Sequence, residues 1–468
     1  MEQYRQKTSF FKRFIGDRAF YKMVLAIAVP IMVQNGITNF VSLLDNIMIG
    51  RIGTEQMSGA AIVNQLLFVY NLCLFGAVSG AGIFTAQYFG QKDHEGIRQT
   101  FRYKIWMVTV LTGISACVLL LAGNPLISLY LEGDGGAGAV EATRNYGMQY
   151  LSIMLLGLPA FMLSQVYSST LRECGETVTP MKAGITAVVV NLVFNYILIY
   201  GKLGFPVLGV RGAAIATVLS RYVELIIVAN WTHRNKEKNP FVKGLYSTMK
   251  VPLRLVKKFF LTGVPLLLNE TLWGAGVAFL TQCYSVRGLN VVAALNIANT
   301  INNVFSVGFI ALGESVAIVV GQILGSGDMK KARDTDNKMI AFAVMCCTAV
   351  AIAMLMVAPL FPMLYNTNGQ AKELAKHFIM VMALVMPQNA FLNASYFTLR
   401  SGGKTIITFI FDCGFIWCIS VPIAYILSRF TGLPVIAVYA LVQAGDLLKC
   451  ILGFVLVKKG MWIQNLVS

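Results

Sequence analysis

Twelve long apolar segments follow one another along this chain of 468 residues, and they constrain its fold more than any other feature. A helix needs about 20 apolar residues to cross the hydrocarbon core of a bilayer. Because every backbone polar group in lipid must be bonded internally, we expect each span to be a helix. The predicted spans are 23–50, 58–86, 103–123, 146–170, 180–201, 207–231, 255–285, 291–322, 338–361, 374–399, 405–428 and 433–457.

The composition agrees with an all-α membrane protein. Only 13% of the residues are charged, against about 25% in soluble globular proteins. The first span is too long for the apolar core of a cleaved signal peptide, and no small-residue cleavage pattern follows it. A net charge of +17 would suggest nucleic acid in a soluble protein. Here the basic residues are concentrated in the N-terminus and in particular loops, which indicates membrane topology and attraction to anionic lipid.

The distribution of basic residues predicts the orientation. Most Lys and Arg lie in the N-terminal segment, including Arg5, Lys7, Lys12 and Arg13, and in loops that would share one side with the C-terminal tail. The stretch 231–258 is the most basic of these loops. By the positive-inside rule both termini are cytoplasmic. We therefore expect a multi-pass protein of the bacterial cytoplasmic (inner) membrane.

The two halves of the chain repeat each other. A shift of 235 residues aligns 30–98 with 265–333 without a gap, and YFGQKD (88–93) then meets ILGSGD (323–328). Further along, LRECGET (171–177) matches LRSGGKT (399–405). Each half holds six spans, and because six is even the repeat is parallel. The predicted domains are an N-lobe over 1–231, a cytoplasmic linker over 232–254 and a C-lobe over 255–468.

No motif for catalysis is present in the sequence. We find no HExxH, GxSxG or Walker loop, so we do not expect an enzyme or ATP coupling within this chain. The nine cysteines lack a CxxC pair, and with three histidines they suggest no soft-metal cluster. The two-lobe repeat instead predicts a transporter that rocks about a central cavity.

A charge inside a span needs an explanation, because it costs at least about 2.5–3.5 kcal/mol to insert. Asp45 lies five residues before Gly50, which places it about 8 Å from the outer end of the first span. Asn191 and Asn195 share one face of the fifth span at a similar depth. Thr217 lies at about the same depth in the sixth span. One carboxylate with neutral oxygens suits Na⁺, or a proton on Asp45. We predict a cation site at Asp45, Asn191, Asn195 and Thr217.

Other polar residues form stripes that indicate a substrate cavity. Interhelical hydrogen bonding uses the same residue types and is the alternative explanation. Glu270 lies near the middle of the seventh span and is a candidate for binding a cationic substrate or protons. The predicted cavity residues are Gln34, Thr38, Asn64, Asn71, Glu270, Asn299, Asn303, Asn389 and Asn393.

Several motifs together resemble the multidrug and toxic compound extrusion (MATE) family. They are LLDNIMIGRIG, GAAIVNQL, AQYFGQKDHEGIR, LRECGET, NLVFNYILIYG followed by GVRGAAIATVLSR, and GQILGSGDMKKA. The resemblance covers nearly the whole chain. It implies an antiporter that exports cationic or amphipathic compounds in exchange for Na⁺ or H⁺, without a further cofactor. It also implies a first-lobe cation site at Asp45, Asn191 and Asn195, which would bind Na⁺ in a sodium-coupled protein.

Two alternatives to an antiporter stay open. A lipid-linked oligosaccharide flippase of the wider superfamily would need a strongly cationic cavity, whereas these spans contain acids and few basic residues beyond Arg221 and Lys449. A membrane receptor or channel without coupled transport is the other. The expected partners are a small-molecule substrate and membrane lipid, with no nucleic acid, and we expect a monomer.

Overall fold

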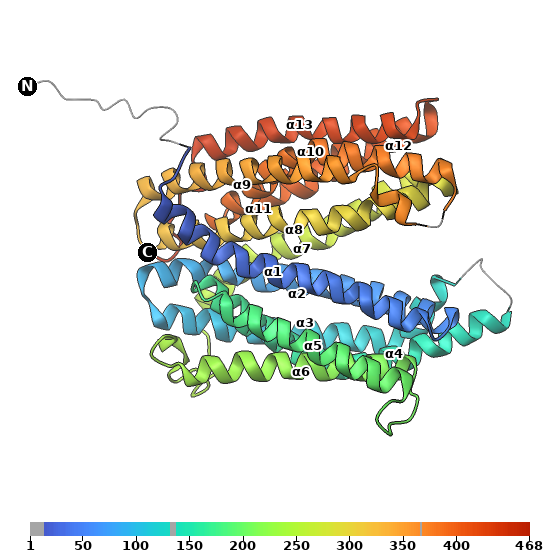
Figure 1. Ribbon diagram of the computed structural model, residues 1–468. Helices are drawn as coiled ribbons and strands as arrows, with labels where there is room; N and C mark the ends of the chain where they lie inside the picture. The colour runs from blue at the N-terminus through green and yellow to red at the C-terminus, as the bar shows by residue number, and fades with distance from the viewer. Residues whose placement is uncertain (1–13, 132–136, 366) are drawn as a thin grey trace, which may run out of the picture. The chain divides into compact units, whose positions relative to one another are not determined.

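The chain folds into long helices. The computed structural model describes residues 14–131, 137–365 and 367–468, and over these residues it contains helices and no strand (Figure 1). Twelve helical segments are long and apolar enough to cross a membrane. The predicted all-α fold with twelve spans is therefore confirmed. The N-terminal basic residues up to Arg13 lie outside the described residues.

The helices extend beyond the predicted apolar segments. The third span, predicted over 103–123, belongs to a helix from His94 to Leu129, because polar residues continue the helix past the hydrocarbon core. The helices of the first half are α1 (Arg18–Gly50), α2 (Thr54–Gln91), α3 (His94–Leu129), α4 (Ala137–Glu173), α5 (Val178–Tyr200) and α6 (Val210–Arg234), followed by the short η2 (Pro240–Val242). Those of the second half are α7 (Leu253–Ser285), α8 (Leu289–Gly325), α9 (Met329–Val357), η3 (Phe361–Leu364), α10 (Gly369–Ser401), α11 (Thr405–Phe409), η4 (Ile410–Gly414), η5 (Ile416–Ser420), α12 (Val421–Phe430) and α13 (Val435–Lys459).

The eleventh span departs from the regular helix that its apolar sequence predicts. It consists of α11, the π-helical turns η4 and η5, and α12. Pro422 is the second residue of α12, which directly follows these turns. Proline has no N–H to donate and its ring clashes with the carbonyl of the residue four positions earlier, so the preceding turns widen.

Contacts divide the chain into two compact units. Unit 1 comprises Met1–Met32, Ala86–Lys92 and Leu272–Ser468, and unit 2 comprises Val33–Thr85 and Asp93–Thr271. Two of the boundaries fall inside α1 and α7, soon after the repeat-related Pro30 and Pro265. The predicted division was made at the sequence repeat instead, with domains 1–231 and 255–468 and a linker over 232–254. That division stays a prediction.

Each unit has its own pattern of helix packing. In unit 2, α4 packs against α3, α5 and α6, and α5 lies along α6. In unit 1, α10 packs against α8, α9 and α13. Buried Phe378, Met382 and Met386 of α10 belong to an apolar cluster that also contains Tyr439 of α13. Close packing of helices that are apolar on most faces is how a bundle holds together in lipid.

The repeat reproduces local structure residue by residue. Asp93 caps α3 by accepting from the backbone N–H groups of Glu95 and Gly96, and its repeat partner Asp328 caps α9 by accepting from Lys331 N–H at 3.0 Å. An N-cap side chain of this kind satisfies backbone donors that the helix leaves free. The YFGQKD and ILGSGD motifs therefore encode the same helix start twice.

Two glycines in these motifs allow close helix contact. A Cβ on Gly90 would lie 1.9 Å from the Gln322 carbonyl oxygen, and a Cβ on Gly325 would lie 1.9 Å from the Gln87 carbonyl oxygen. At the shift of 235 residues Gly90 corresponds to Gly325, and Gln87 corresponds to Gln322. The two contacts are therefore equivalent in the repeat, and the ends of α2 and α8 cross each other in the same way from both sides within unit 1. Only glycine permits so close an approach of two backbones.

Candidate cation site

Four side chains from three helices of unit 2, among them Asp45, form one hydrogen-bonded cluster. Asn195 donates from Nδ2 to Asp45 Oδ1 at 2.6 Å, and the same nitrogen lies 3.1 Å from Asn191 Oδ1. Asn191 lies 3.2 Å from the Thr217 hydroxyl. The structure thus brings together the four residues that the depth argument selected, from α1, α5 and α6. Their role in cation binding stays a prediction.

The helix geometry explains why these residues converge. Asn191 and Asn195 are four apart in α5 and project from one face. Their side chains are 4% and 1% exposed, so the carboxamides must find partners inside the bundle. Thr217 Oγ1 lies 3.0 Å from the Ala213 carbonyl of its own helix and 3.2 Å from the Asn191 amide of α5, so it can bond with either.

The Asn191 amide fits two hydrogen-bond arrangements. In one, its Nδ2 donates to Thr217 Oγ1 at 3.2 Å. In the other, the amide is turned over, its nitrogen donates to Asp45 Oδ1 at 2.9 Å, and its oxygen accepts from Thr217 Oγ1 at 3.2 Å. The single hydroxyl proton of Thr217 then points to Asn191 and not to Ala213. The second arrangement gives every atom of this amide a matched partner around the carboxylate. In both, carboxamide N–H groups stabilise Asp45, and hydrogen bonds to a charged group are stronger than neutral ones.

One oxygen of the cluster has capacity for a ligand. Among the described residues, Asn195 Oδ1 is buried and accepts no hydrogen bond. A buried acceptor without a partner is costly, and it would be satisfied by a cation beside Asp45. The described residues contain no group of three or more His, Cys, Asp and Glu that could hold a metal ion. One carboxylate with amide and hydroxyl oxygens fits a hard monovalent cation or a proton, not a transition metal.

Two residues near the cluster were missed by the sequence argument. Tyr150 of α4 is 4% exposed, donates to Asn64 Oδ1 at 3.3 Å and interacts with Thr217 and Asp45. Arg221 of α6, one turn after Thr217, acts electrostatically on Asp45. Tyr150 lies four residues into its predicted span, so the depth criterion would have found it had aromatic hydroxyls been included.

Arg221 is held away from a direct ion pair with Asp45 by other partners. Its Nη1 lies 3.2 Å from Glu224 Oε2, and its guanidinium stacks 4.7 Å from the centre of the Phe161 ring. Glu224 is 3% exposed. The carboxamides are therefore the groups that hydrogen-bond to Asp45. Arg221 stabilises the negative charge of Asp45 from a longer distance.

The predicted cavity residues are divided between the two units. In unit 2, Asn64 accepts from Tyr150, and Gln34 packs against α5 at Gly184. Glu270 is half-buried, while Thr38 and Asn71 are exposed. In unit 1, Asn299 and Asn389 are half-buried, Asn303 is exposed, and Asn393 Oδ1 packs against Gly313 of α8. A substrate cavity lined by all nine residues stays a prediction.

The rest of the chain also contains buried charges. Lys104 of α3 is fully buried and lies 2.5 Å from Glu173. Asp412 accepts from Lys449 of α13 at 2.7 Å. Asp336 of α9 is fully buried and accepts from Thr398 Oγ1 at 2.6 Å. Asp336 was not among the predicted site residues, because it lies two residues before the predicted ninth span, where an acid resembles one in a solvated loop.

Comparison with known proteins agrees with this architecture. The family model described as MatE matches residues 30–197 and 267–426. A probable multidrug resistance protein NorM of Thermotoga maritima is 25% identical over 95% of this chain and 94% of its own length. The multidrug resistance protein PmpM of Pseudomonas aeruginosa is 26% identical over 88% of this chain and 84% of its own.

Solved structures share the fold. A multidrug resistance MATE family transporter of the MOP superfamily, in an outward-facing conformation, superimposes with a TM-score of 0.80 at 21% identity. That match covers 96% of this chain and 97% of the other. The Vibrio cholerae MATE transporter VcmN gives a TM-score of 0.84 at 16% identity and covers 96% of this chain and 98% of its own.

Proposed function

The chain belongs to the MatE family, and from that premise we propose that it is a secondary antiporter that exports drugs in exchange for Na⁺ or H⁺. The names of the relatives, which are multidrug resistance proteins, support drug export. The proposed substrates are cationic or amphipathic small molecules. The observation that carries the coupling proposal is the 2.6 Å contact between Asn195 Nδ2 and Asp45 Oδ1, beside the unpartnered Asn195 Oδ1.

The coupling ion would act by changing the charge of this buried cluster. Na⁺ would use the Asp45 carboxylate together with oxygens of Asn191, Asn195 and Thr217. A proton would neutralise Asp45 directly. Either ion can move the transporter between conformations only through its differential affinity for them. The carboxamide hydrogen bonds to Asp45 are the contacts that binding would rearrange.

Basic residues inside the described spans do not favour the flippase alternative. Arg221 is bonded to Glu224, Lys449 to Asp412, and Lys104 to Glu173. A site for a pyrophosphate group would need such cations turned toward the ligand. The substrate contacts are instead proposed among the predicted cavity residues of each unit, such as Gln34 and Asn64 in unit 2 and Asn389 and Asn393 in unit 1. We also propose a monomer in the bacterial cytoplasmic membrane with both termini in the cytoplasm.

The test is ethidium export by Asp45→Asn in proteoliposomes. The substitution keeps the shape of the side chain and removes its charge. We expect gradient-driven export to fall below about a tenth of the wild-type rate, since hydrogen bonds to a charged group contribute about 1.5–3 kcal/mol. Wild-type export by correctly inserted Asp45→Asn protein would show that the coupling role is wrong.

A matched control makes the same charge change elsewhere. Asp334 of α9 forms a surface pair with Lys338 at 2.6 Å, and Asp334→Asn should export ethidium at the wild-type rate. Separate sodium and pH gradients, applied to the wild type, identify the ion: export must follow one of them. Export that responds to neither gradient would contradict antiport while leaving the geometry of the cluster unexplained.

A further inference from the structure

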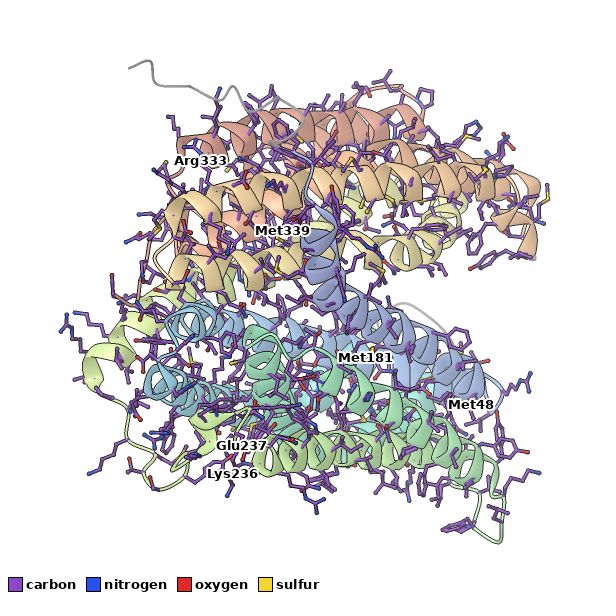
Figure 2. All side chains as sticks on the ribbon, turned by 60° about the vertical axis from the view of Figure 1, so that its left-hand side comes forward. Met48, Met181, Lys236, Glu237, Arg333 and Met339 are labelled. Atoms are coloured by element: carbon purple, nitrogen blue, oxygen red, sulfur yellow. The ribbon has the colours of Figure 1, made fainter. Side chains whose placement is uncertain are left out.

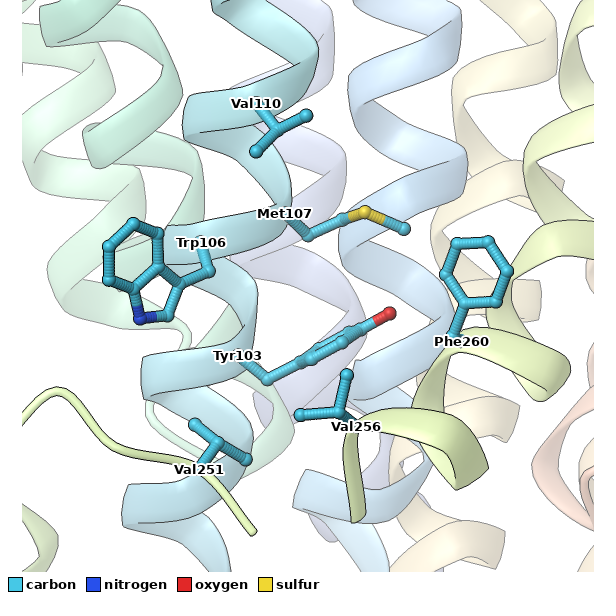
Figure 3. Close-up of a pocket in the computed structure, with 7 residues that line it drawn as sticks. All are labelled: Tyr103, Trp106, Met107, Val110, Val251, Val256 and Phe260. Carbon is cyan, nitrogen blue, oxygen red and sulfur yellow. The ribbon is translucent and has the colours of Figure 1, made fainter. Parts of the chain in front are cut away.

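A groove outside the cation cluster lies on the surface of unit 2, where the start of α7 meets α3 (Figure 3). Its volume is about 350 Å³. Trp106, Met107 and Val110 of α3 form one wall, and Val256 and Phe260 of α7 form the other. Trp106, Val110 and Phe260 are each about half exposed, so the groove opens to the surroundings of the helices. On a membrane-spanning helix those surroundings are lipid.

The hydroxyl of Tyr103 points into this apolar groove (Figure 3). Tyr103 is 5% exposed, and among the described residues its hydroxyl has no hydrogen-bond partner. Its ring packs against Phe259 with centroids 5.2 Å apart, and the hydroxyl is directed between Met107 and Phe260 (Figure 3). An unpaired buried hydroxyl is unfavourable. A ligand that offers a hydrogen-bond acceptor at this point would satisfy it.

Basic residues surround one end of the groove. Lys257 follows Val256 directly and precedes Phe260 by three residues, so it lies on the adjoining strip of the same helix. Arg254 lies three residues earlier, and Lys250 precedes Val251, which lines the groove. All three basic side chains are exposed. This end of the groove therefore attracts an anionic group.

The linker is fixed in place beside the groove. Trp106 donates from Nε1 to the Met249 carbonyl at 3.0 Å. Arg102 donates to the Leu245 carbonyl at 2.9 Å and to the Gly244 carbonyl at 2.8 Å. These bonds position the basic segment that leads into α7. The site is thus held by hydrogen bonds across 143 residues of sequence and does not depend on a loose loop.

We propose that this groove binds one anionic glycerophospholipid. Along the groove, the exposed basic residues come first, the Tyr103 hydroxyl second, and the apolar walls up to Val110 last. This is the order of phosphate, ester carbonyl and acyl chain in such a lipid. Tyr103 and Val110 are seven positions apart, which is about 10 Å along α3 and accommodates part of an acyl chain. The phosphate meets Arg254 and Lys257, and an ester carbonyl accepts from Tyr103 Oη.

The charge requirement is tested by mass spectrometry of the intact protein with bound lipid. Purified protein is mixed with phosphatidylglycerol or phosphatidylcholine of equal chain length. We expect wild type to retain phosphatidylglycerol preferentially, and Arg254→Gln/Lys257→Gln to lower its affinity about 30-fold, at about fivefold per basic residue. The matched control, Lys236→Gln/Lys238→Gln, removes the same charge elsewhere in the linker (Lys236 is labelled in Figure 2) and should retain the lipid as wild type does.

Equal retention of the two lipids by wild type would overturn the proposal, and so would an equal loss in both double variants. The hydroxyl is tested with Tyr103→Phe, which removes an atom that bonds to nothing else described and should fold normally. We expect an affinity about fivefold lower for diester phosphatidylglycerol and unchanged for a diether analogue, which has no ester carbonyl. An unchanged affinity for the diester lipid would contradict the assigned position of the carbonyl.

Discussion

The fifth and eleventh spans correspond in the repeat, yet they differ in structure and in chemistry. The shift that aligns residue 171 with 399 is 228 residues, and it places Asn191 and Asn195 opposite Ile419 and Ile423. α5 is an uninterrupted helix, whereas its counterpart passes through the π-helical turns before Pro422. Ile423 packs against the apolar cluster of unit 1. One span presents two carboxamides to a carboxylate, and the other is packed with apolar residues.

The position of Asp45 shows the same contrast. Its counterpart at the 235-residue shift is Leu280, which packs against the same apolar cluster. The helix caps at Asp93 and Asp328, by comparison, are conserved between the halves. The repeat therefore specifies where helices start and cross, whereas Asp45, Asn191 and Asn195 correspond to apolar residues in the second half. The predicted cation site belongs to unit 2.

Buried charge also differs between the halves. Thr170 and Thr398 correspond at the 228-residue shift. Thr170 lies 3.2 Å from the Lys104 ammonium, which also lies 2.5 Å from Glu173, whereas Thr398 donates to Asp336. Equivalent threonines thus face a cation in one half and a carboxyl group in the other.

The largest expected effect is on stability in unit 2. Lys104→Met removes an ammonium group that is fully buried between Glu173, Ser169 and Thr170. Breaking a buried ion pair in this way costs about 3–5 kcal/mol. We expect a large fall in the thermal unfolding midpoint in detergent. The control Lys338→Met removes a more exposed pair and should cost about 1 kcal/mol or less. Equal midpoints for the two variants would contradict this account.

The second prediction makes α5 resemble its counterpart. Asn195→Leu is close to isosteric and removes both the donor to Asp45 and the unpartnered oxygen. We expect the ion concentration that half-saturates export to rise about 10- to 100-fold, from the strength of a hydrogen bond to a charged group. Asn195→Asp, which keeps the oxygens, should retain export. If Asn195→Leu exported with unchanged ion dependence, the carboxamide would not belong to the site.

Sequence reasoning located this site because loop positions set depth. Asp45 and Asn195 lie five and six residues before Gly50 and Gly201, and Thr217 lies six residues after Arg211. Equal depth in neighbouring helices can bring such side chains within reach. Depth gives no rotation about the helix axis, so it could not show whether the residues faced one another. Arg221 could not be assigned for that reason, whereas Tyr150 lies at a suitable depth and was missed because aromatic hydroxyls were not considered. Hydropathy could not predict the π-helical turns either, because it reports how apolar a segment is and not which backbone groups hydrogen-bond to each other.

The third prediction concerns the hydroxyl of the cluster. Thr217→Val keeps the shape and removes Oγ1, which bonds with Asn191 and with the Ala213 carbonyl. A single neutral hydrogen bond contributes about 0.5–1.5 kcal/mol. The half-saturating ion concentration should therefore rise about threefold to tenfold, while Thr217→Ser stays close to wild type. An effect larger than that of Asn195→Leu would move the centre of the site from α5 to α6.

The smallest effect is expected for Asp336, the buried carboxyl of unit 1. Its Oδ1 accepts from Thr398, while its Oδ2 has no hydrogen-bond partner among the described residues. Asp336→Asn keeps the acceptor for Thr398 and places an amide nitrogen where the unpartnered oxygen was. We expect the stability to change by about 1 kcal/mol or less, because no existing bond is lost. We also expect ethidium export with an unchanged ion dependence. A stable Asp336→Asn protein that fails to export would mean that the second half carries a coupling carboxyl of its own, at a different depth and between different helices from Asp45.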